Sequence, residues 1–319
     1  MKILITGGAG FIGSHLAEKL LNEGHNVSVI DNLSTGSLLN IRHLIDNPKF
    51  EFTIDSVLDK KIVKKLVSEC SQIYHLAAAV GVRNIIDNPL LSLQTNIGGT
   101  ENVLEFANKY KKKVLITSTS EIYGKSENLP FKEGDDRLLG STHITRWSYS
   151  SSKAIDEFLA LAYYREKKLP VVIVRCFNTV GPRQTGQYGM VVPKFVKNAL
   201  LNHPIEIYGD GKQSRCFAYV SDVVDGLVKL MNNKETEGEI FNIGNDEEIT
   251  IEDLAKKIKK MTNSKSKIVY MKYEDAYETG FEDMKRRIPD LSKINKLIGY
   301  EPKVKLNELL KRIIEYYEE

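Results

Sequence analysis

Short apolar runs alternate with longer amphipathic segments over the first 176 residues, and this alternation limits the folds open to the chain. The runs are rich in Val and Ile and have the length of buried strands. Strands that alternate with helices form βαβ units, which build a parallel sheet covered by helices on both faces. We predict strands at Lys2–Thr6, Asn26–Ile30, Phe50–Ile54, Gln72–Leu76, Val114–Ser118 and Val171–Arg175. We predict helices at Gly13–Glu23, Lys60–Ser68, Ser92–Tyr110 and Ser150–Lys167.

The pattern changes after residue 176, where prolines and glycines separate shorter elements. A chain of 319 residues has room for about two domains. The predicted fold is therefore α/β, with a doubly wound parallel sheet in residues 1–176. Residues 177–319 are expected to form mainly a smaller C-terminal lobe for the substrate, with some chain returning to the first domain.

Charge and cysteine content exclude several classes of function. The chain has 45 basic and 42 acidic residues, and a net charge of +3 is too small to indicate nucleic-acid binding. No apolar run approaches the ~18 residues that span a bilayer, and the N-terminus does not resemble a secretory signal. The three cysteines show no spacing typical of a disulfide framework or a zinc site. We expect a cytoplasmic protein with no metal and no nucleic-acid or membrane partner.

A glycine-rich turn follows the first predicted strand and precedes an amphipathic helix. Glycine lets the backbone turn sharply and lets a pyrophosphate approach the free N–H groups at the start of the helix. A strand, a glycine turn and a helix in this order indicate a Rossmann-type domain that binds a dinucleotide. The phosphates are expected at Gly7, Gly10 and Gly13.

The second predicted strand is followed by Asp31, at about the distance from Gly13 expected for an acid that binds ribose hydroxyls. Its carboxylate would accept two hydroxyls and repel a 2′-phosphate. Asn32 follows, with no adjacent Arg or Lys, so NAD is favoured over NADP as the cofactor. After the fourth strand, Ala77 and Ala78 are small enough to leave room for the adenine and its ribose.

Two further segments carry residues suited to proton transfer. Thr119, Ser120 and Glu121 follow the fifth predicted strand, and ligands bind beyond the carboxyl ends of parallel strands. Tyr149 and Lys153 are four residues apart and so share one helix face. An ammonium beside a phenol lowers the pKa of that phenol from about 10 toward neutrality. The phenolate would then take a proton from a sugar hydroxyl while hydride moves to the nicotinamide.

Over essentially its whole length, the chain resembles the extended short-chain dehydrogenase/reductases that modify nucleotide sugars. The likeness rests on the glycine turn, the segments HLAA and TSTSEIYG, the Tyr149/Lys153 pair, and the segments that begin at Arg175 and Tyr208. It implies bound NAD, with further cofactor contacts from Phe11, Ile12, Asp55, Leu76 and Thr117. It places a nucleoside-diphosphate sugar among Asn178, Val192, Tyr208 and Arg215.

The family is expected to begin by oxidising the sugar C4 hydroxyl, and three continuations remain open. A 4-epimerase returns hydride to the other face and needs no carboxylate after the Ser/Thr pair, so Glu121 counts against it. A 4,6-dehydratase needs a base for C5 and an acid for C6, and many carry Asp-Glu where this chain has Ser120-Glu121. A UDP-glucuronate decarboxylase loses the C6 carboxylate, which is β to the ketone, and gives UDP-xylose or a related pentose.

Local segments resemble the decarboxylases most. They are Thr119–Glu121, Arg146–Lys153 and Glu282–Asp290. In the last segment the family places an arginine near the sugar, and Arg287 matches that position. It would hold the carboxylate and stabilise the enolate. Arg83 lies in a loop that resembles those of 4-epimerases and would bind a sugar acid or a phosphate.

Decarboxylation is the leading expectation, with dehydration and epimerisation as alternatives. A non-enzymatic NAD-sensing protein is a further alternative, but a sensor has no need of the Thr119, Tyr149 and Lys153 set. The amphipathic segments Ser92–Tyr110 and Ser150–Lys167 carry apolar faces, and relatives commonly pair such helices across a twofold axis. We therefore expect a homodimer with a four-helix interface.

Overall fold

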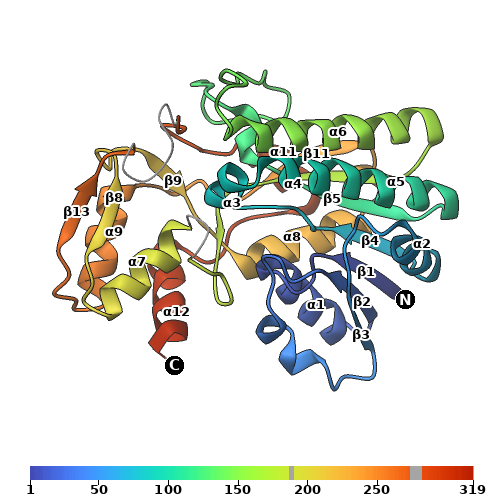
Figure 1. The fold of residues 1–319 in the computed structure, drawn as a ribbon, viewed down its shortest axis with the longest axis horizontal. Helices are drawn as coiled ribbons and strands as arrows, with labels where there is room; N and C mark the ends of the chain where they lie inside the picture. The colour runs from blue at the N-terminus through green and yellow to red at the C-terminus, as the bar shows by residue number, and fades with distance from the viewer. Residues whose placement is uncertain (187–189, 274–281, 319) are drawn as a thin grey trace.

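A seven-stranded parallel sheet forms the larger part of the computed structural model, which describes residues 1–186, 190–273 and 282–318. The strand order is β11-β6-β5-β4-β1-β2-β3 (Figure 1). Central strands are buried on both faces, as expected for a parallel sheet between helices. The strands are β1 Lys2–Thr6, β2 Asn26–Asp31, β3 Phe50–Ile54, β4 Gln72–His75, β5 Lys113–Thr119, β6 Val171–Cys176 and β11 Glu239–Ile243.

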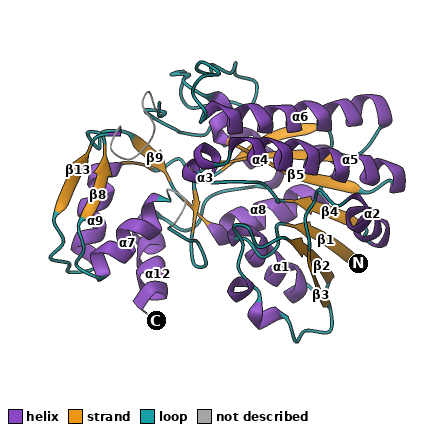
Figure 2. Cartoon of the chain, in the orientation of Figure 1, coloured by secondary structure: helices purple, strands orange, loops and turns teal. Residues whose placement is uncertain are grey.

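Helices cover the two faces of the sheet (Figure 2). Each layer of helices packs on the sheet in an apolar core of its own. One core includes residues of α1 (Phe11–Asn22), α8 (Val220–Asn232) and α11 (Ser292–Ile298). The other includes residues of α2 (Lys60–Glu69), α5 (Gly99–Tyr110) and α6 (Trp147–Lys167). The predicted α/β doubly wound fold is therefore confirmed.

The predicted helix Ser92–Tyr110 is interrupted. It consists of the end of α4 (Pro89–Leu93), a π-helical turn over Gln94–Gly98, and α5. Two consecutive glycines lie at the junction, and glycine weakens a regular helix. A Cβ at Gly99 would come within 2.6 Å of Val57, so the close approach of α5 to that side chain requires glycine. The turn carries the buried Asn96, whose amide bonds the Ala79 N–H and Ser152.

The C-terminal part of the chain divides between the sheet and a smaller lobe. Strand β11 and helix α8 belong to the sheet, whereas a separate apolar core holds the lobe together. The lobe contains α7 (Val191–Leu200), α9 (Ile251–Met261) and α12 (Leu306–Glu318). Its short strands pair as β8 Ile205–Tyr208 with β13 Ile268–Met271, β9 Ser214–Cys216 with β12 Glu248–Thr250, and β10 Ala218–Tyr219 with β7 Thr179–Val180.

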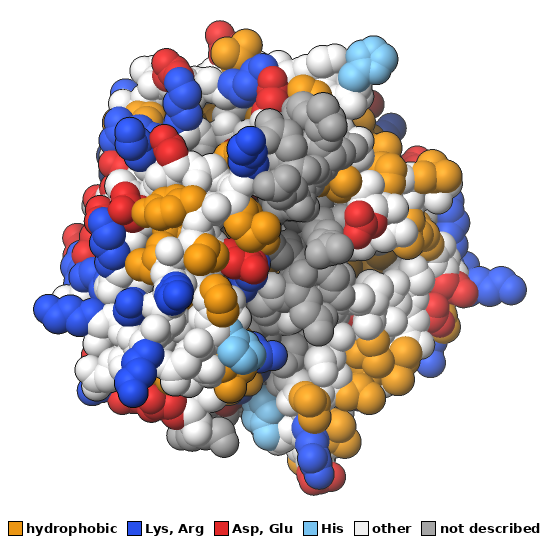
Figure 3. Space-filling model, turned by 60° about the vertical axis from the view of Figure 1, so that its left-hand side comes forward, with side chains coloured by type: hydrophobic (Ala, Val, Ile, Leu, Met, Phe, Trp, Pro, Cys, Tyr) orange, Lys and Arg blue, Asp and Glu red, His pale blue; other side chains and the backbone are white. Residues whose placement is uncertain are grey.

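The remaining helical elements are short. They are α3 Val82–Asp87 and the 3₁₀ turns η1 Leu38–Asn40, η2 Arg42–Leu44, η4 Ser120–Tyr123 and η5 Lys234–Thr236. No helix in the described part of the chain is long and apolar enough to cross a membrane. On the face shown in Figure 3, basic and acidic side chains are interspersed, which agrees with the small net charge.

Candidate active site

A cavity of about 1060 Å³ lies between the carboxyl ends of the sheet strands and the smaller lobe. The predicted site residues that line it are Gly7, Gly10, Phe11, Ile12, Gly13, Asp31, Asn32, Asp55, Leu76, Ala77, Ala78, Thr117, Thr119, Ser120, Glu121, Tyr149, Lys153, Asn178, Val192, Tyr208, Arg215 and Arg287. Arg83 belongs to α3, but its side chain lies outside what the structure describes. Residues from distant parts of the sequence therefore surround one space.

The glycine turn is shaped to admit an anionic group. Gly7 has a positive φ of 72°, and a Cβ there would lie 2.8 Å from the Ala77 nitrogen. A Cβ at Gly13 would come within hard contact of the Gly7 carbonyl, so this position also requires glycine. At Gly10 no side chain caps α1, which leaves the first N–H groups of the helix for a ligand. These features fit the pyrophosphate of a dinucleotide.

Asp31 lies at the end of β2, next to the glycine turn. Its Oδ2 accepts from the Ala9 N–H at 3.0 Å and its Oδ1 from the Leu33 N–H at 2.8 Å. Burial raises the pKa of this carboxyl, while the backbone amides oppose that shift. Each carboxylate oxygen keeps acceptor capacity for a ribose hydroxyl. Residues 30–40 contribute no Lys or Arg to the cavity wall, so the residues present fit NAD better than NADP.

His75, at the end of β4, is a buried residue of the protein interior. Its ring nitrogens face Thr6 Oγ1 at 2.7 Å and Thr100 Oγ1 at 3.1 Å. Burial lowers its pKa to about 3, so the ring is neutral at physiological pH. This arrangement agrees with the interpretation of His75 as a packed strand histidine, bonded on both sides within the core.

The predicted proton-transfer residues meet at the carboxyl end of β5. Thr119 ends this strand and caps η4, because its Oγ1 accepts from the Glu121 N–H at 3.2 Å. Tyr149, on α6, is hydrogen-bonded through its side chain to Thr119. A hydroxyl chain from threonine to phenol is the arrangement that proton transfer from a sugar hydroxyl requires.

The pKa of Tyr149 differs from the expectation based on its spacing to Lys153. Burial, with the negative charge of Glu121 second, raises the pKa of this phenol above its usual value. The Lys153 ammonium instead lies 3.2 Å from Asp156 Oδ2, deeper in α6. The prediction of a phenol made acidic by the lysine is therefore wrong, because burial and the neighbouring negative charges raise the pKa of this phenol.

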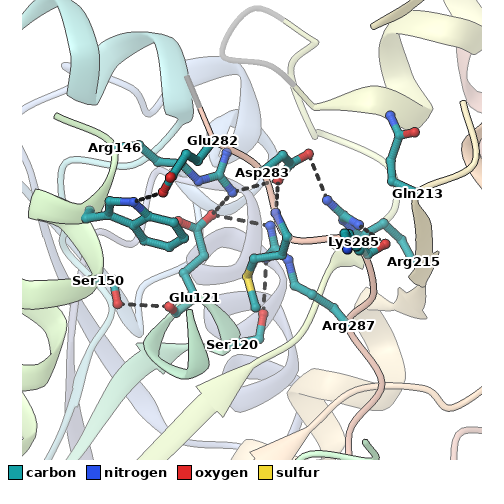
Figure 4. A network of polar contacts seen from close by, with 12 residues as sticks. Ser120, Glu121, Arg146, Ser150, Gln213, Arg215, Glu282, Asp283, Lys285 and Arg287 are labelled. Carbon is teal, nitrogen blue, oxygen red and sulfur yellow. Dashed lines mark hydrogen bonds and ion pairs between the residues drawn. The ribbon is translucent and has the colours of Figure 1, made fainter. Parts of the chain in front are cut away.

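Five charged side chains, four of them buried, form a cluster beside Ser120, shown in Figure 4. Arg287 donates through Nη1 to Ser120 Oγ at 3.2 Å and through Nη2 to Glu121 Oε1 at 3.4 Å. Arg146 Nη2 lies 3.6 Å from Glu121 Oε1 and 3.0 Å from Asp283 Oδ1. Arg215 Nη2 completes the cluster by bonding Asp283 Oδ2 at 2.9 Å.

The cluster carries an unbalanced positive charge. Three arginines face two carboxylates, which leaves a formal charge of +1. Arg287 is buried, its Nε has no hydrogen-bond partner, and burial lowers its pKa to about 10. Burying an unpaired charge costs folding free energy, and one more anion at the cavity wall would balance that charge. The geometry therefore suits a ligand with a carboxylate near Glu121.

The far end of the cavity lies in the smaller lobe. Lys194, on α7, donates to Tyr208 Oη at 2.8 Å and to Glu206 Oε2 at 2.7 Å. Gln213 donates to the Tyr208 carbonyl oxygen at 2.9 Å. Val192 is buried in the same helix, and Asn178 donates to the Cys216 carbonyl oxygen at 3.1 Å. The lobe thus offers an aromatic ring, an amide and an ammonium to one end of a ligand.

Sequence reasoning assigned no role to Arg146 or Asp283, although both line the cavity. Arg146 immediately precedes α6, three residues before Tyr149, and its position in the segment that resembles the decarboxylases was the available signal. Asp283 lies four residues before Arg287, so the same segment supplies both members of the cluster. Neither pairing is visible in sequence, because the partners lie far apart in the chain.

Side chains grouped like metal ligands are absent from the part of the chain that the structure describes. No group of three or more His, Cys, Asp or Glu side chains there is arranged to hold a metal ion. Cys70, Cys176 and Cys216 are free thiols. Cys176 lines the cavity, and burial raises its pKa to about 12, so it is a protonated, apolar part of the wall.

Comparisons with known proteins show which family the chain is similar to. A family model described as GDP-mannose 4,6 dehydratase matches residues 4–313. A UDP-N-acetyl-alpha-D-glucosaminuronate decarboxylase of Bacillus cytotoxicus is 43% identical, over 100% of this chain and 98% of its own. UDP-glucuronic acid decarboxylase 1 of Arabidopsis thaliana is 40% identical, over 98% of this chain and 69% of its own.

A solved structure also has a similar fold. The UDP-glucuronic acid 4-epimerase of Bacillus cereus, in complex with UDP-glucuronic acid and NAD, superposes with a TM-score of 0.90. It is 31% identical, and the match covers 100% of this chain and 99% of that one. The chain therefore belongs to the GDP-mannose 4,6 dehydratase family, among the extended short-chain dehydrogenase/reductases that modify nucleotide sugars.

Proposed function

We propose that the protein is an NAD-dependent decarboxylase of a UDP-linked hexuronic acid, acting through a 4-keto sugar. The observation that carries this proposal is the buried cluster around Glu121, whose net charge of +1 faces the cavity. A sugar carboxylate would balance that charge and accept from the unpartnered Nε of Arg287. The relatives named above as decarboxylases act, by their names, on UDP-glucuronic acid and on UDP-N-acetyl-alpha-D-glucosaminuronate.

NAD would be held by the glycine turn and Asp31, and when bound it accepts hydride from the sugar C4 and later returns it. Tyr149 takes the proton of the C4 hydroxyl, and Thr119 shares the hydrogen bond on the same oxygen. The positive charge of an oxidised nicotinamide lowers the pKa of a neighbouring phenol. Binding of the cofactor is therefore what would make Tyr149 a competent base despite its burial.

Oxidation at C4 places a ketone β to the C6 carboxylate. The C5–C6 bond then breaks, carbon dioxide leaves, and the electron pair forms an enolate across C5, C4 and O4. We assign Arg287 to holding the carboxylate and stabilising the enolate. Glu121, fixed by Arg146 and Arg287, is the group placed to relay a proton from solvent to C5. Hydride return to C4 and a proton on O4 complete the pentose.

The binding roles follow the two ends of the cavity. We propose that Tyr208 and Val192 contact the nucleotide base, with Asn178 and Arg215 at the diphosphate and sugar. Arg83 stays a prediction for the sugar acid. A 4,6-dehydratase would use Glu121 at C6 and remains the second candidate, because the same carboxyl could act as its acid. A 4-epimerase of a uronate would use the arginine cluster to bind the same carboxylate, but it would need no proton from Glu121.

The test is turnover of a panel of sugar nucleotides, read by mass spectrometry and NMR. UDP-glucuronate, its 2-acetamido counterpart, UDP-glucose and dTDP-glucose are incubated with the protein and NAD. We expect loss of carbon dioxide from a uronate and no change in the neutral sugars. Loss of water from a neutral hexose would establish dehydration instead, and unchanged mass with new sugar signals would establish epimerisation. Tyr149→Phe is the control, which retains NAD but turns over nothing.

We also propose a homodimer and a cytoplasmic location. Exposed apolar side chains occur on neighbouring helices α4 and α6, including Leu90, Leu91, Ile155 and Phe158. The exposed positions of α5 are charged, so the apolar contact would come from α4 and α6 rather than from α5 itself. The free cysteines fit a reducing compartment.

A further inference from the structure

A carboxylate lies beneath the candidate lysine. Asp156 is one turn after Lys153 on α6, and its Oδ2 is 3.2 Å from the Lys153 Nζ. The side chain of Asp156 is fully buried, and that of Lys153 is 2% exposed. The other oxygen, Oδ1, has no hydrogen-bond partner. A buried carboxylate with one oxygen left without a hydrogen bond lowers stability. Its position beside the lysine therefore needs an explanation.

The surroundings of the pair come from four elements. On α5, the Thr100 hydroxyl bonds Asp156 and also His75 of β4. His75 is neutral, because its pKa is about 3, and Cys176 of β6 is a neutral thiol. Glu157, on α6, adds a negative charge near Asp156, although its own carboxylate is bonded to Arg175 of β6. The Lys153 ammonium is therefore the charge that chiefly compensates Asp156.

This pairing adds to burial in keeping the pKa of the phenol high. The Asp156 carboxylate is among the negative charges that raise the pKa of Tyr149, together with Glu121. An ammonium paired with a carboxylate presents a dipole rather than a full charge, so its effect on a phenol one turn away is reduced. The buried carboxylate thus opposes the effect that Lys153 alone would have.

We propose that Asp156 is a positioning residue, which anchors the Lys153 ammonium below the phenol and sets the pH range in which Tyr149 acts as a base. The proposal rests on the proposed function, since it concerns the proton transfer that opens the reaction. It assigns Asp156 no contact with substrate or cofactor. The carboxylate fixes the position of the ammonium and limits how strongly it favours the phenolate.

The test replaces Asp156 with a neutral side chain of the same shape. In Asp156→Asn the negative charge is lost, the phenolate is favoured, and the pKa of Tyr149 falls. The base form then exists at lower pH, so the acidic limb of the kcat/KM profile moves down by about one pH unit. A merely structural role would lower kcat at every pH without moving that limb. Asp222→Asn is the matched control, because Asp222 is a buried helical carboxylate that bonds the Lys303 and Val304 N–H groups away from the cavity.

A second readout needs neither substrate nor cofactor. A difluorotyrosine placed at position 149, whose phenol is intrinsically more acidic, is titrated by fluorine NMR in the wild-type background and with Asp156→Asn. The titration is expected at lower pH with Asp156→Asn and at the wild-type pH with Asp222→Asn. Asp156→Ser serves in the same experiment if the asparagine variant does not fold. An unchanged titration in a folded Asp156 variant overturns the inference. Absence of uronate turnover by the wild type would overturn the proposed reaction while the fluorine titration still decides the role of Asp156.

Discussion

At the scale of single residues, two adjacent arginines differ in what surrounds them. Arg287 is buried against Ser120 and Glu121, whereas Arg286 is half-exposed and pairs with Glu248. Arg287→Met removes the fork that would bind the sugar carboxylate, so kcat/KM for the uronate should fall at least about 100-fold, or about 2.7 kcal/mol. Arg286→Met breaks only a surface ion pair and should stay near the wild-type value. Steady-state kinetics of the two variants decide this, and equal losses would contradict the assignment.

Glu121 separates the reactions that remain open. Its carboxylate lies 3.4 Å from Arg287 and 3.6 Å from Arg146, so Glu121→Gln keeps the shape but removes the charge and the proton carrier. Decarboxylation or dehydration should drop by about 100-fold or more, whereas epimerisation would lose little. Product formation by mass spectrometry and NMR gives the answer. Full activity of the variant would refute the decarboxylase assignment, and NAD binding, measured in parallel, checks that the fold survives.

At the scale of elements, a buried network holds the turn that carries Glu121. Arg175 of β6 binds Glu157 of α6 through Nε at 2.9 Å and Nη2 at 2.8 Å. Its Nη1 donates to the Tyr123 hydroxyl at 3.0 Å, and that hydroxyl donates to Asn242 of β11 at 2.6 Å. Tyr123 is the last residue of η4. Hydrogen bonds from Arg175 and from the Tyr123 hydroxyl therefore tie this turn to β6, β11 and α6.

Glu157→Gln should therefore lower both stability and activity. It leaves Arg175 buried without its anion, which costs about 3–5 kcal/mol of unfolding free energy. It also loosens η4, so kcat should fall while NAD affinity stays, because the glycine turn is on a different loop. Urea denaturation and kinetics measure the two effects. Glu127→Gln is the control, since its ion pair with Lys285 is exposed on both sides and contributes little.

The elements were predictable where local pattern determines them. Lys2–Thr6 and Phe50–Ile54 were predicted with the bounds that the structure has, although Lys2–Thr6 is a buried strand and Phe50–Ile54 is a partly exposed edge strand. The break between α4 and α5 was not predicted. A Cβ at Gly99, next to the π-helical turn, would lie 2.6 Å from Val57, and the spacing of apolar residues along one helix cannot reveal such a close approach.

In the site, too, the sequence predicted the residues whose positions follow from local pattern. Motif residues such as Gly7 and Tyr149 line the cavity, since each lies where a strand or helix of known direction places it. The roles of Asp156, Arg146 and Asp283 were missed. Their significance comes from partners on other elements or from burial, and a single sequence shows neither. The pKa direction of Tyr149 was wrong for the same reason, because the cost of burying a phenol depends on the packed protein.

At the scale of the whole molecule, the cavity combines the two parts of the chain. The sheet and its covering helices contribute the glycine turn, Thr119 and Tyr149, whereas the smaller lobe contributes Tyr208 and Arg215. Arg287 lies between α9 and α12 of the lobe in sequence, but its side chain bonds Ser120, which follows β5. The charged cluster of Figure 4 therefore joins residues of the sheet with residues of the lobe.

The outer surface of the molecule carries the last prediction. Phe158 is 66% exposed and Ile155 41% exposed on α6, beside the exposed Leu90 of α4. Large apolar side chains grouped on neighbouring helices favour a second copy of the chain, and a twofold axis would bring the same surface against itself. Phe158→Glu places like charges across that axis and should convert the dimer to a monomer, as measured by size-exclusion chromatography with light scattering. Leu201→Glu, a similarly exposed position after α7, should leave the dimer intact. A wild-type protein that is monomeric at micromolar concentration would show that this apolar surface is not a dimer interface.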